Sequence, residues 1–259
     1  MMCRHLWYIQ RTGGYMPELN LLHIFFLIVI GIGAGLIQRV CGFGIGMFSM
    51  LFMPHFLPSY TGALSCCSSV SSVQSAYNAV RFRKKIPYRV VLPALLGASV
   101  TIPLAVYFSS KIPQGSLKKL LGVVLVCLSV YFLFVSSRLK MKPSFRNGLI
   151  AGTVGGVLNG FFAAGAPPVV MYFSSTTDDK DTYFAATQFY FFFTNVYSTV
   201  SRIVAGMMGW NVAVYALISI VGSLIGTRIG GKLVNRIDAK TLKTVIYCAM
   251  AFSGILMIF

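Results

Sequence analysis

The sequence is poor in acidic residues: five of its 259 residues are Asp or Glu, against 22 Lys and Arg. Charged residues make up only 10% of the chain and hydrophobic residues 56%, whereas a soluble domain carries about 25% charged residues. A soluble domain of this length could not bury so much apolar surface, because much of any small domain faces water. The composition therefore excludes a soluble globular domain and predicts a polytopic, all-α membrane protein.

Metal-binding and redox patterns are also missing. The three His residues are scattered, and the six Cys residues include no CxxC pair and no metal-ligand spacing. We expect no disulfide, no metal and no other cofactor. We also expect no enzyme activity, because the sequence contains no cluster of titratable residues typical of an active site. The basic residues form short runs between apolar segments, which argues against nucleic acid as a partner. These runs fit the positive-inside rule, and they could also attract anions or anionic lipids.

Long apolar segments supply the membrane crossings. Since roughly 20 residues span a bilayer, the chain has room for about eight to ten segments. The expected long spans are Leu19–Ile37, Thr61–Val80, Val90–Ser109, Leu117–Ser136, Gly148–Phe161, Tyr183–Met208, Val212–Ile229 and Leu242–Phe259. Two shorter segments, Gly46–Leu57 and Gly165–Ser174, cannot cross alone. The first span is too long for a signal-peptide core, so residues 1–18 are expected to form a short tail, with Met16 as an alternative start.

Each short segment follows a glycine-rich break, Gly31–Gly46 and Gly152–Pro168. A shift of 121 positions places Gly35 on Gly156 and Gln38 on Asn159, and a shift of 125 places Gly97 on Gly222. We interpret the chain as two repeated halves, residues 19–137 and 148–259, joined by a loop at 138–147. Paired, glycine-interrupted short segments of this kind are typical of transporters.

The breaks predict a binding site for physical reasons. Backbone outside a helix is tolerated at membrane depth only where protein or a wet cavity surrounds it. Two breaks at equivalent positions would bring two half-helices to such a cavity, and helix N-termini favour anions. The alternative is that the glycines only allow close helix packing. This alternative suits Gly31, Gly35, Gly152 and Gly156 better than the dense run around Gly42 and Gly44.

Basic residues discriminate between two topologies. With eight spans they divide almost evenly between the two sides of the membrane. With ten segments, one side holds Arg39, Arg81–Arg89, Arg138–Arg146, Lys180 and Arg228–Lys243, and therefore most of the positive charge. We prefer the ten-segment arrangement, in which the two halves are inverted relative to each other and the N-terminus is outside.

At these breaks the sequence resembles the sulfite exporter TauE/SafE family of membrane permeases. The resemblance rests on Gly33–Pro54 and Gly152–Met171, with support from the recurring glycine patterns around Gly97 and Gly222, and it covers the chain from about residue 20. The chain departs from the common pattern in having Arg39 and Cys41 in the first break and Ala-Pro-Pro at 166–168 in the second. The resemblance implies transport of small anions such as sulfite or organosulfonates.

Polar residues inside membrane segments are costly and often functional. Gln38 and Asn159 carry amide donors, and arginine matches sulfonate and carboxylate geometry. Gln188, Asn195 and Arg202 share one face of a predicted helix. The expected substrate-binding residues, from the breaks and this face, are Gln38, Arg39, Gly42, Gly44, Asn159, Gly165, Ala166, Gln188, Asn195 and Arg202. The alternatives are helix–helix hydrogen bonding for the amides and snorkelling to the interface for Arg202. The serine-rich stretch Ser65–Ser75 is expected to bond its own helix backbone, or else to line a path for an anion.

None of the five acidic residues falls within a predicted span, which argues against carboxylate-based proton coupling. We therefore expect a multi-pass protein of the cell inner membrane that exports small anions, driven by the membrane potential or an ion gradient. Its partners would be a small anionic substrate and the lipid bilayer, and we also consider a homodimer. The rival functions are a membrane scaffold or assembly factor, a channel, and an enzyme acting on lipid-linked substrates.

Overall fold

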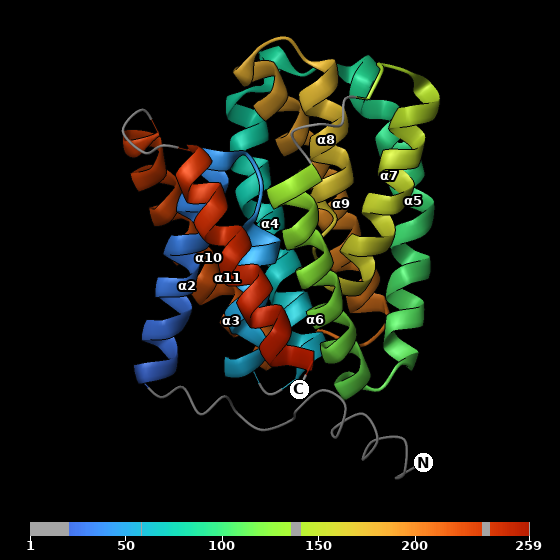
Figure 1. Ribbon diagram of the computed structural model, residues 1–259. Helices are drawn as coiled ribbons and strands as arrows, with labels where there is room; N and C mark the ends of the chain where they lie inside the picture. Colours follow the sequence, from blue (N-terminus) through green and yellow to red (C-terminus); the bar gives the residue numbers. More distant parts are fainter. Residues whose placement is uncertain (1–20, 58, 136–140, 235–238, 259) are drawn as a thin grey trace.

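The computed structural model describes residues 21–57, 59–135, 141–234 and 239–258, which form a bundle of helices running roughly side by side (Figure 1). The predicted tail at 1–18 lies outside the described residues. The long helices are α2 (Leu21–Cys41), α4 (Tyr60–Arg81), α5 (Tyr88–Lys111), α6 (Gln114–Val130), α7 (Phe145–Phe162), α9 (Lys180–Val204), α10 (Trp210–Leu233) and α11 (Ala239–Ile258). The short ones are α3 (Ile45–Phe56), α8 (Ala166–Thr176), η1 (Arg83–Lys85) and the π-helical turn η2 (Tyr131–Val135). The predicted all-α class is confirmed, since the described residues contain no strand.

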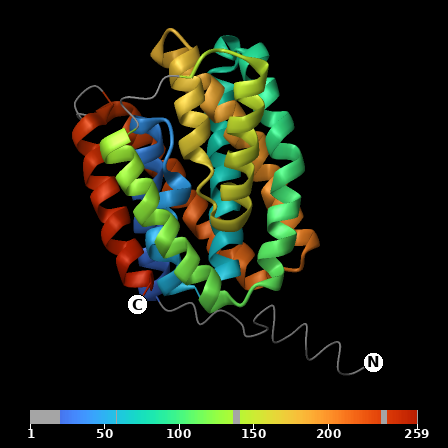
Figure 2. The ribbon, with the colours of Figure 1, turned by 45° about the vertical axis from the view of Figure 1, so that its right-hand side comes forward.

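Four helices of the described residues are long and apolar enough to cross a membrane by length and composition: α2, α5, α10, and α6 with the start of η2. The helices α4 and α9 are equally long but more polar, and they pack against each other inside the bundle. Their polarity is tolerated because neighbouring helices, rather than lipid, surround most of their side chains. The outer helices pair around them, with α2 along α10, α5 along α7 and α6 along α11 (Figures 1 and 2).

The serine-rich face of α4 lies inside the protein. The hydroxyl groups of Ser65, Ser68 and Ser72 donate to carbonyl oxygens of their own helix, at 2.9, 3.0 and 2.8 Å. For these three serines the prediction of bonds to their own helix backbone is confirmed, whereas Ser71 lines the cavity described below and Ser75 accepts from Gln38. Such bonds leave a small, satisfied surface on α4, against which α9 can approach closely.

The short helices α3 and α8 lie in different halves of the molecule, with their N-termini near its centre (Figure 1). The α2 helix ends where Gly42 turns left-handed, with φ 82°, and the Gly42 N–H donates to Gln38 O at 2.8 Å. The α7 helix ends in the same way at Ala163, with φ 53° and a bond from its N–H to Asn159 O at 2.9 Å. Both ends are αL caps, which satisfy the carbonyls that each helix leaves exposed.

The breaks are shorter than the sequence predicts. Gly31 and Gly35 lie inside α2, and Gly152 and Gly156 inside α7, so only residues 42–44 and 163–165 interrupt the helices. The helical glycines serve close packing: a methyl group at Gly31 would lie 2.5 Å from Ser219 O of α10. For these four positions the packing alternative is correct, because small residues let two helix backbones approach.

We predict that Gly152→Val lowers the thermal midpoint of the purified protein by several degrees, because a side chain at 152 collides with the backbone of Ala94 on α5. Overpacking of this kind costs about 1–3 kcal/mol. The matched control is Gly115→Ala, in the first turn of α6, where an added methyl group meets nothing within 4 Å. Equal midpoints for the two variants in a detergent thermal-unfolding assay would contradict the close-packing role.

Candidate functional site

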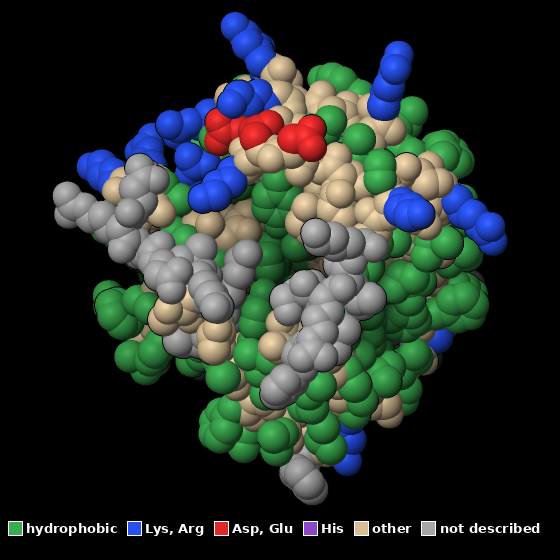
Figure 3. Space-filling view, turned by 45° about the horizontal axis from the view of Figure 1, so that its top comes forward, with side chains coloured by type: hydrophobic (Ala, Val, Ile, Leu, Met, Phe, Trp, Pro, Cys, Tyr) green, Lys and Arg blue, Asp and Glu red, His purple; other side chains and the backbone are tan. Residues whose placement is uncertain are grey.

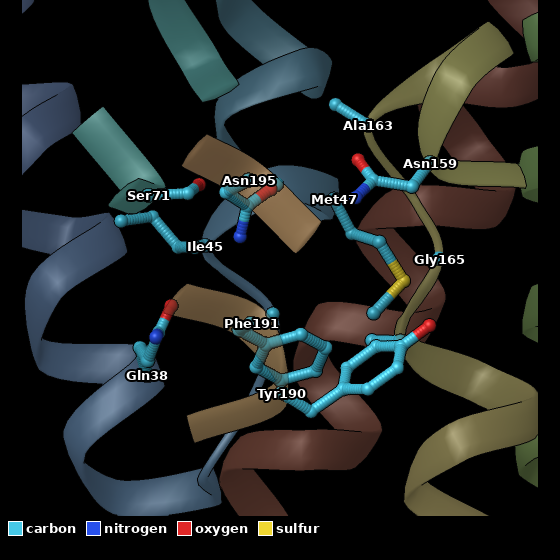
Figure 4. A pocket seen from close by; sticks show the side chains of 13 residues that line it. Gln38, Ile45, Met47, Ser71, Asn159, Ala163, Gly165, Tyr190, Phe191 and Asn195 are labelled. Atoms are coloured by element: carbon cyan, nitrogen blue, oxygen red, sulfur yellow. The ribbon is translucent and has the colours of Figure 1, made fainter. Parts of the chain in front are cut away.

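A small cavity of about 30 Å³ lies where the two breaks meet. It is lined by Gln38, Gly44, Ile45, Gly46, Met47, Ser71, Asn159, Ala163, Gly165, Ala166, Tyr190, Phe191 and Asn195 (Figure 4). These residues come from both breaks, from the first turns of α3 and α8, and from the central helices α4 and α9. A space of this size holds one or two water molecules, so a larger ligand would enter only if the surrounding helices moved apart.

The two helix N-termini at the cavity differ in their hydrogen-bond donors. The first N–H groups of an α-helix have no partner within the helix, and on α3 these belong to Ile45, Gly46 and Met47. On α8 the second and third residues are Pro167 and Pro168, which have no N–H. Both helix dipoles direct their positive ends toward the cavity. The α3 terminus therefore contributes more N–H donors to an anion than the α8 terminus does.

Amide side chains face the cavity from opposite sides, with Asn195 on α9 and Asn159 on α7 turned toward the space between them (Figure 4). Both are at least nine-tenths buried. Within the described residues, Asn159 Oδ1 and the Tyr190 hydroxyl are buried without a hydrogen-bond partner. Rotation of the amide would present its NH₂ group instead, since the O and N positions are interchangeable. These unsatisfied groups indicate that a polar ligand or water belongs in the cavity.

A network of amides borders the cavity on its Gln38 side. Gln38 Nε2 donates to Gln188 Oε1 at 2.8 Å and to Ser75 Oγ at 3.2 Å. Asn78 Nδ2 donates to the same Gln188 oxygen at 3.3 Å, and Gln188 Nε2 donates to Gly42 O at 2.8 Å. Gln188 and Gly42 therefore lie behind the cavity wall. They hold the end of α2 against α4 and α9, and only Gln38 of this network reaches the cavity itself.

Arg202 is fully buried, which excludes snorkelling to the interface. Its Nη2 donates to Asn159 O at 3.0 Å and to Gly160 O at 2.9 Å, and its Nε donates to Ser198 Oγ at 3.3 Å. Among the described residues, its Nη1 has no hydrogen-bond partner. The guanidinium thus lies behind the cavity wall, bound to the carbonyl end of α7, where the helix dipole favours positive charge.

Arg39 is separated from the cavity. It lies in the last turn of α2, half-buried, with its guanidinium 5.2 Å from the centre of the Phe82 ring and 5.0 Å from that of Phe184. These are cation–π distances. Of the ten predicted binding residues, six line the cavity, Gln188, Gly42 and Arg202 support it from behind, and Arg39 belongs to another part of the surface.

Sequence reasoning missed several lining residues. Ser71 lies within the predicted serine-rich stretch, but no pattern singled it out from its neighbours. Met47, Tyr190 and Phe191, which also line the cavity, cannot be distinguished in the sequence from other apolar residues of a membrane helix. Ala163 was missed because only glycine signals a left-handed turn from sequence, and this position holds alanine.

Acidic residues of the described chain lie at one end of the bundle. Asp179 caps α9 by accepting from the N–H groups of Asp181 and Thr182, and its hydrogen bonds with Thr182 lower its pKa. Lys85 of η1 donates to Asp181 Oδ2 at 2.6 Å, and this bond raises the pKa of Lys85. Figure 3 shows Lys and Arg side chains gathered around this acidic group. Within the described residues, no group of three or more His, Cys, Asp or Glu could hold a metal ion.

Comparison with known proteins gives one family. Neither the curated proteins nor the solved structures yielded a match to this chain. The model of the family described as sulfite exporter TauE/SafE matches residues 27–257, which include every residue that lines the cavity. Family membership and the apolar helices agree with a multi-pass membrane protein. The chain therefore belongs to the sulfite exporter TauE/SafE family.

Proposed function

We propose that the protein exports small organic or inorganic anions, such as sulfite or organosulfonates, and binds them in the cavity at the two helix breaks. The observation that carries this proposal is the chemistry of the cavity wall. It combines the positive end of α3, neutral amides of Asn159 and Asn195, and no carboxylate. Hydrogen-bond donors without a fixed negative charge select anions over cations.

The proposed transport cycle rests on two inverted halves. In this arrangement α2–α6 correspond to α7–α11. Two observations support it: the αL caps at Gly42 and Ala163 are 121 positions apart, and the pairing of α2 with α10 is mirrored by the pairing of α7 with α5. Rocking of one half against the other would expose the cavity to each side of the membrane in turn.

The proposed orientation puts the basic end in the cytoplasm of a cell inner membrane. Arg39 contacts Phe82 and Phe184, and Lys85 contacts Asp181, so residues at three basic segments of the ten-segment topology lie close together. An anion leaving a cell whose interior is negative moves down the electrical gradient. No titratable carboxylate is then needed at the cavity, which agrees with its lining.

We predict that Asn159→Leu weakens sulfite binding about 10- to 100-fold, because loss of a hydrogen bond to a charged ligand costs about 1.5–3 kcal/mol. The KM of sulfite flux in proteoliposomes would report the change. Asn147→Leu is the matched control, since Asn147 lies in the first turn of the same helix, about 18 Å away along its axis. An unchanged KM for Asn159→Leu, in protein that elutes like the parent, would remove this cavity as the site.

We also predict that sulfite flux in proteoliposomes follows an imposed potential. A potential of 100 mV is worth about 2.3 kcal/mol per charge moved, which sustains a roughly 50-fold concentration ratio. If flux does not respond to the potential but follows an ion gradient, the ion gradient and not the membrane potential is the driving force. Absence of any anion flux or binding would favour the membrane scaffold, and a channel would be recognised by its much higher turnover.

A further inference from the structure

Arg202 occupies the stretch of protein between the cavity and a second, larger opening. On α9, Asn195 lines the cavity and Arg202 follows two turns later, about 10 Å along the axis. The residues that come next, Ala205, Gly206 and Met207, line a cleft of about 250 Å³. The Met207 N–H also donates to Arg202 O at 2.9 Å, so the arginine is tied directly to the wall of this cleft.

The cleft is polar and lies at the end of the bundle away from the acidic group. Its other lining residues include Thr61, Lys111 and Gln114. The α9 helix begins beside Lys85 and ends at this cleft 25 residues later, so the two features lie at opposite ends of the molecule. Lys111 provides a positive charge at the opening, which would attract an anion there.

We propose that Arg202 is a positioning residue that closes the route between the cavity and this cleft. The inference rests on the proposed transport function. In the structure the guanidinium is fully buried and is held by Asn159 O, Gly160 O and the Ser198 hydroxyl. Its free Nη1 is the group that a passing anion would bind. Opening the route means breaking the two carbonyl bonds, which also frees the end of α7 at the cavity.

We call Arg202 and its carbonyl contacts the gate. The proposed inverted repeat predicts an equivalent residue in the first half of the chain. The shift of 121 that relates Gln38 to Asn159 also relates Arg81 to Arg202. Arg81 ends α4 as Arg202 ends α9, but its side chain is exposed, and the carbonyl of Gln38 is met by the Gly42 N–H. In this structure Arg202 is therefore hydrogen-bonded in the closed position at the cleft end, whereas Arg81 at the opposite end is not in the equivalent position. In the opposite state Arg81 would close its own end and Arg202 would swing away.

Thiol labelling tests the gate without relying on transport. Asn195→Cys, in a background lacking Cys3, Cys127 and Cys248, places a thiol in the cavity wall. A membrane-impermeant cationic methanethiosulfonate is added to one side at a time, and Ala205→Cys identifies the side to which the cleft opens. Adding Arg202→Ala should raise labelling of the cavity thiol from that side about tenfold, the factor that corresponds to one lost charge-assisted hydrogen bond.

Three comparisons make the result decisive. Arg81→Ala is the matched control and should leave labelling from the cleft side unchanged. Should Arg202→Ala fail to fold, Arg202→Lys and Ser198→Ala, which weaken the same contacts, should give a smaller rise from that side. No rise in any variant, or an equal rise from both sides, would overturn the gate. A rise in labelling, together with no anion flux by the parent protein in proteoliposomes, would instead keep the gate and reject the proposed function.

Discussion

Backbone N–H and C=O groups at a helix end inside a membrane must find hydrogen-bond partners within the protein. The arrangement of the helices here depends on how the chain satisfies these groups at the ends of α2 and α7. At Gly42 and Ala163 the chain turns left-handed, and an N–H returns to a carbonyl of the helix just ended. Two further carbonyls at these ends, Gly42 O and Gly160 O, accept from Gln188 and Arg202 of α9. Because one helix supplies both partners, α9 must be polar, and it can be polar only because other helices cover it.

The outer helix pairs are held together by glycine packing. Glycines of α2 and α10 lie against the backbone of the partner helix, and so do glycines of α5 and α7, so these pairs pack backbone to backbone. The apolar faces turned outward suit lipid, whereas the polar face of the central pair is sealed from it. The fold thus separates two tasks: glycine seams hold the outer helices together, and amide and hydroxyl side chains of α4 and α9 organise the centre.

Much of this organisation could be predicted from the sequence, and the exceptions have physical causes. Hydropathy located the helices to within a few residues, and the glycine density pointed to the interruptions. The glycine pattern alone does not distinguish a glycine that allows close helix packing, such as Gly152, from one that adopts a left-handed turn, such as Gly42. Both roles depend on the same property, the absence of a side chain. Arg39 and Arg202 looked alike in sequence, but tertiary packing buried one and left the other between two aromatic rings at the end of the bundle.

The Pro167-Pro168 pair makes the two sides of the cavity chemically different. With N–H donors concentrated at α3 and few at α8, the cavity has a polar pole and a drier one. Phe191 and the methyl group of Ala166 add to the apolar lining. If anions bind here as we propose, an organosulfonate would be held in a single orientation, its oxygens toward α3 and its carbon-bearing end toward α8. The two prolines thereby make the two helix N-termini at the cavity unlike.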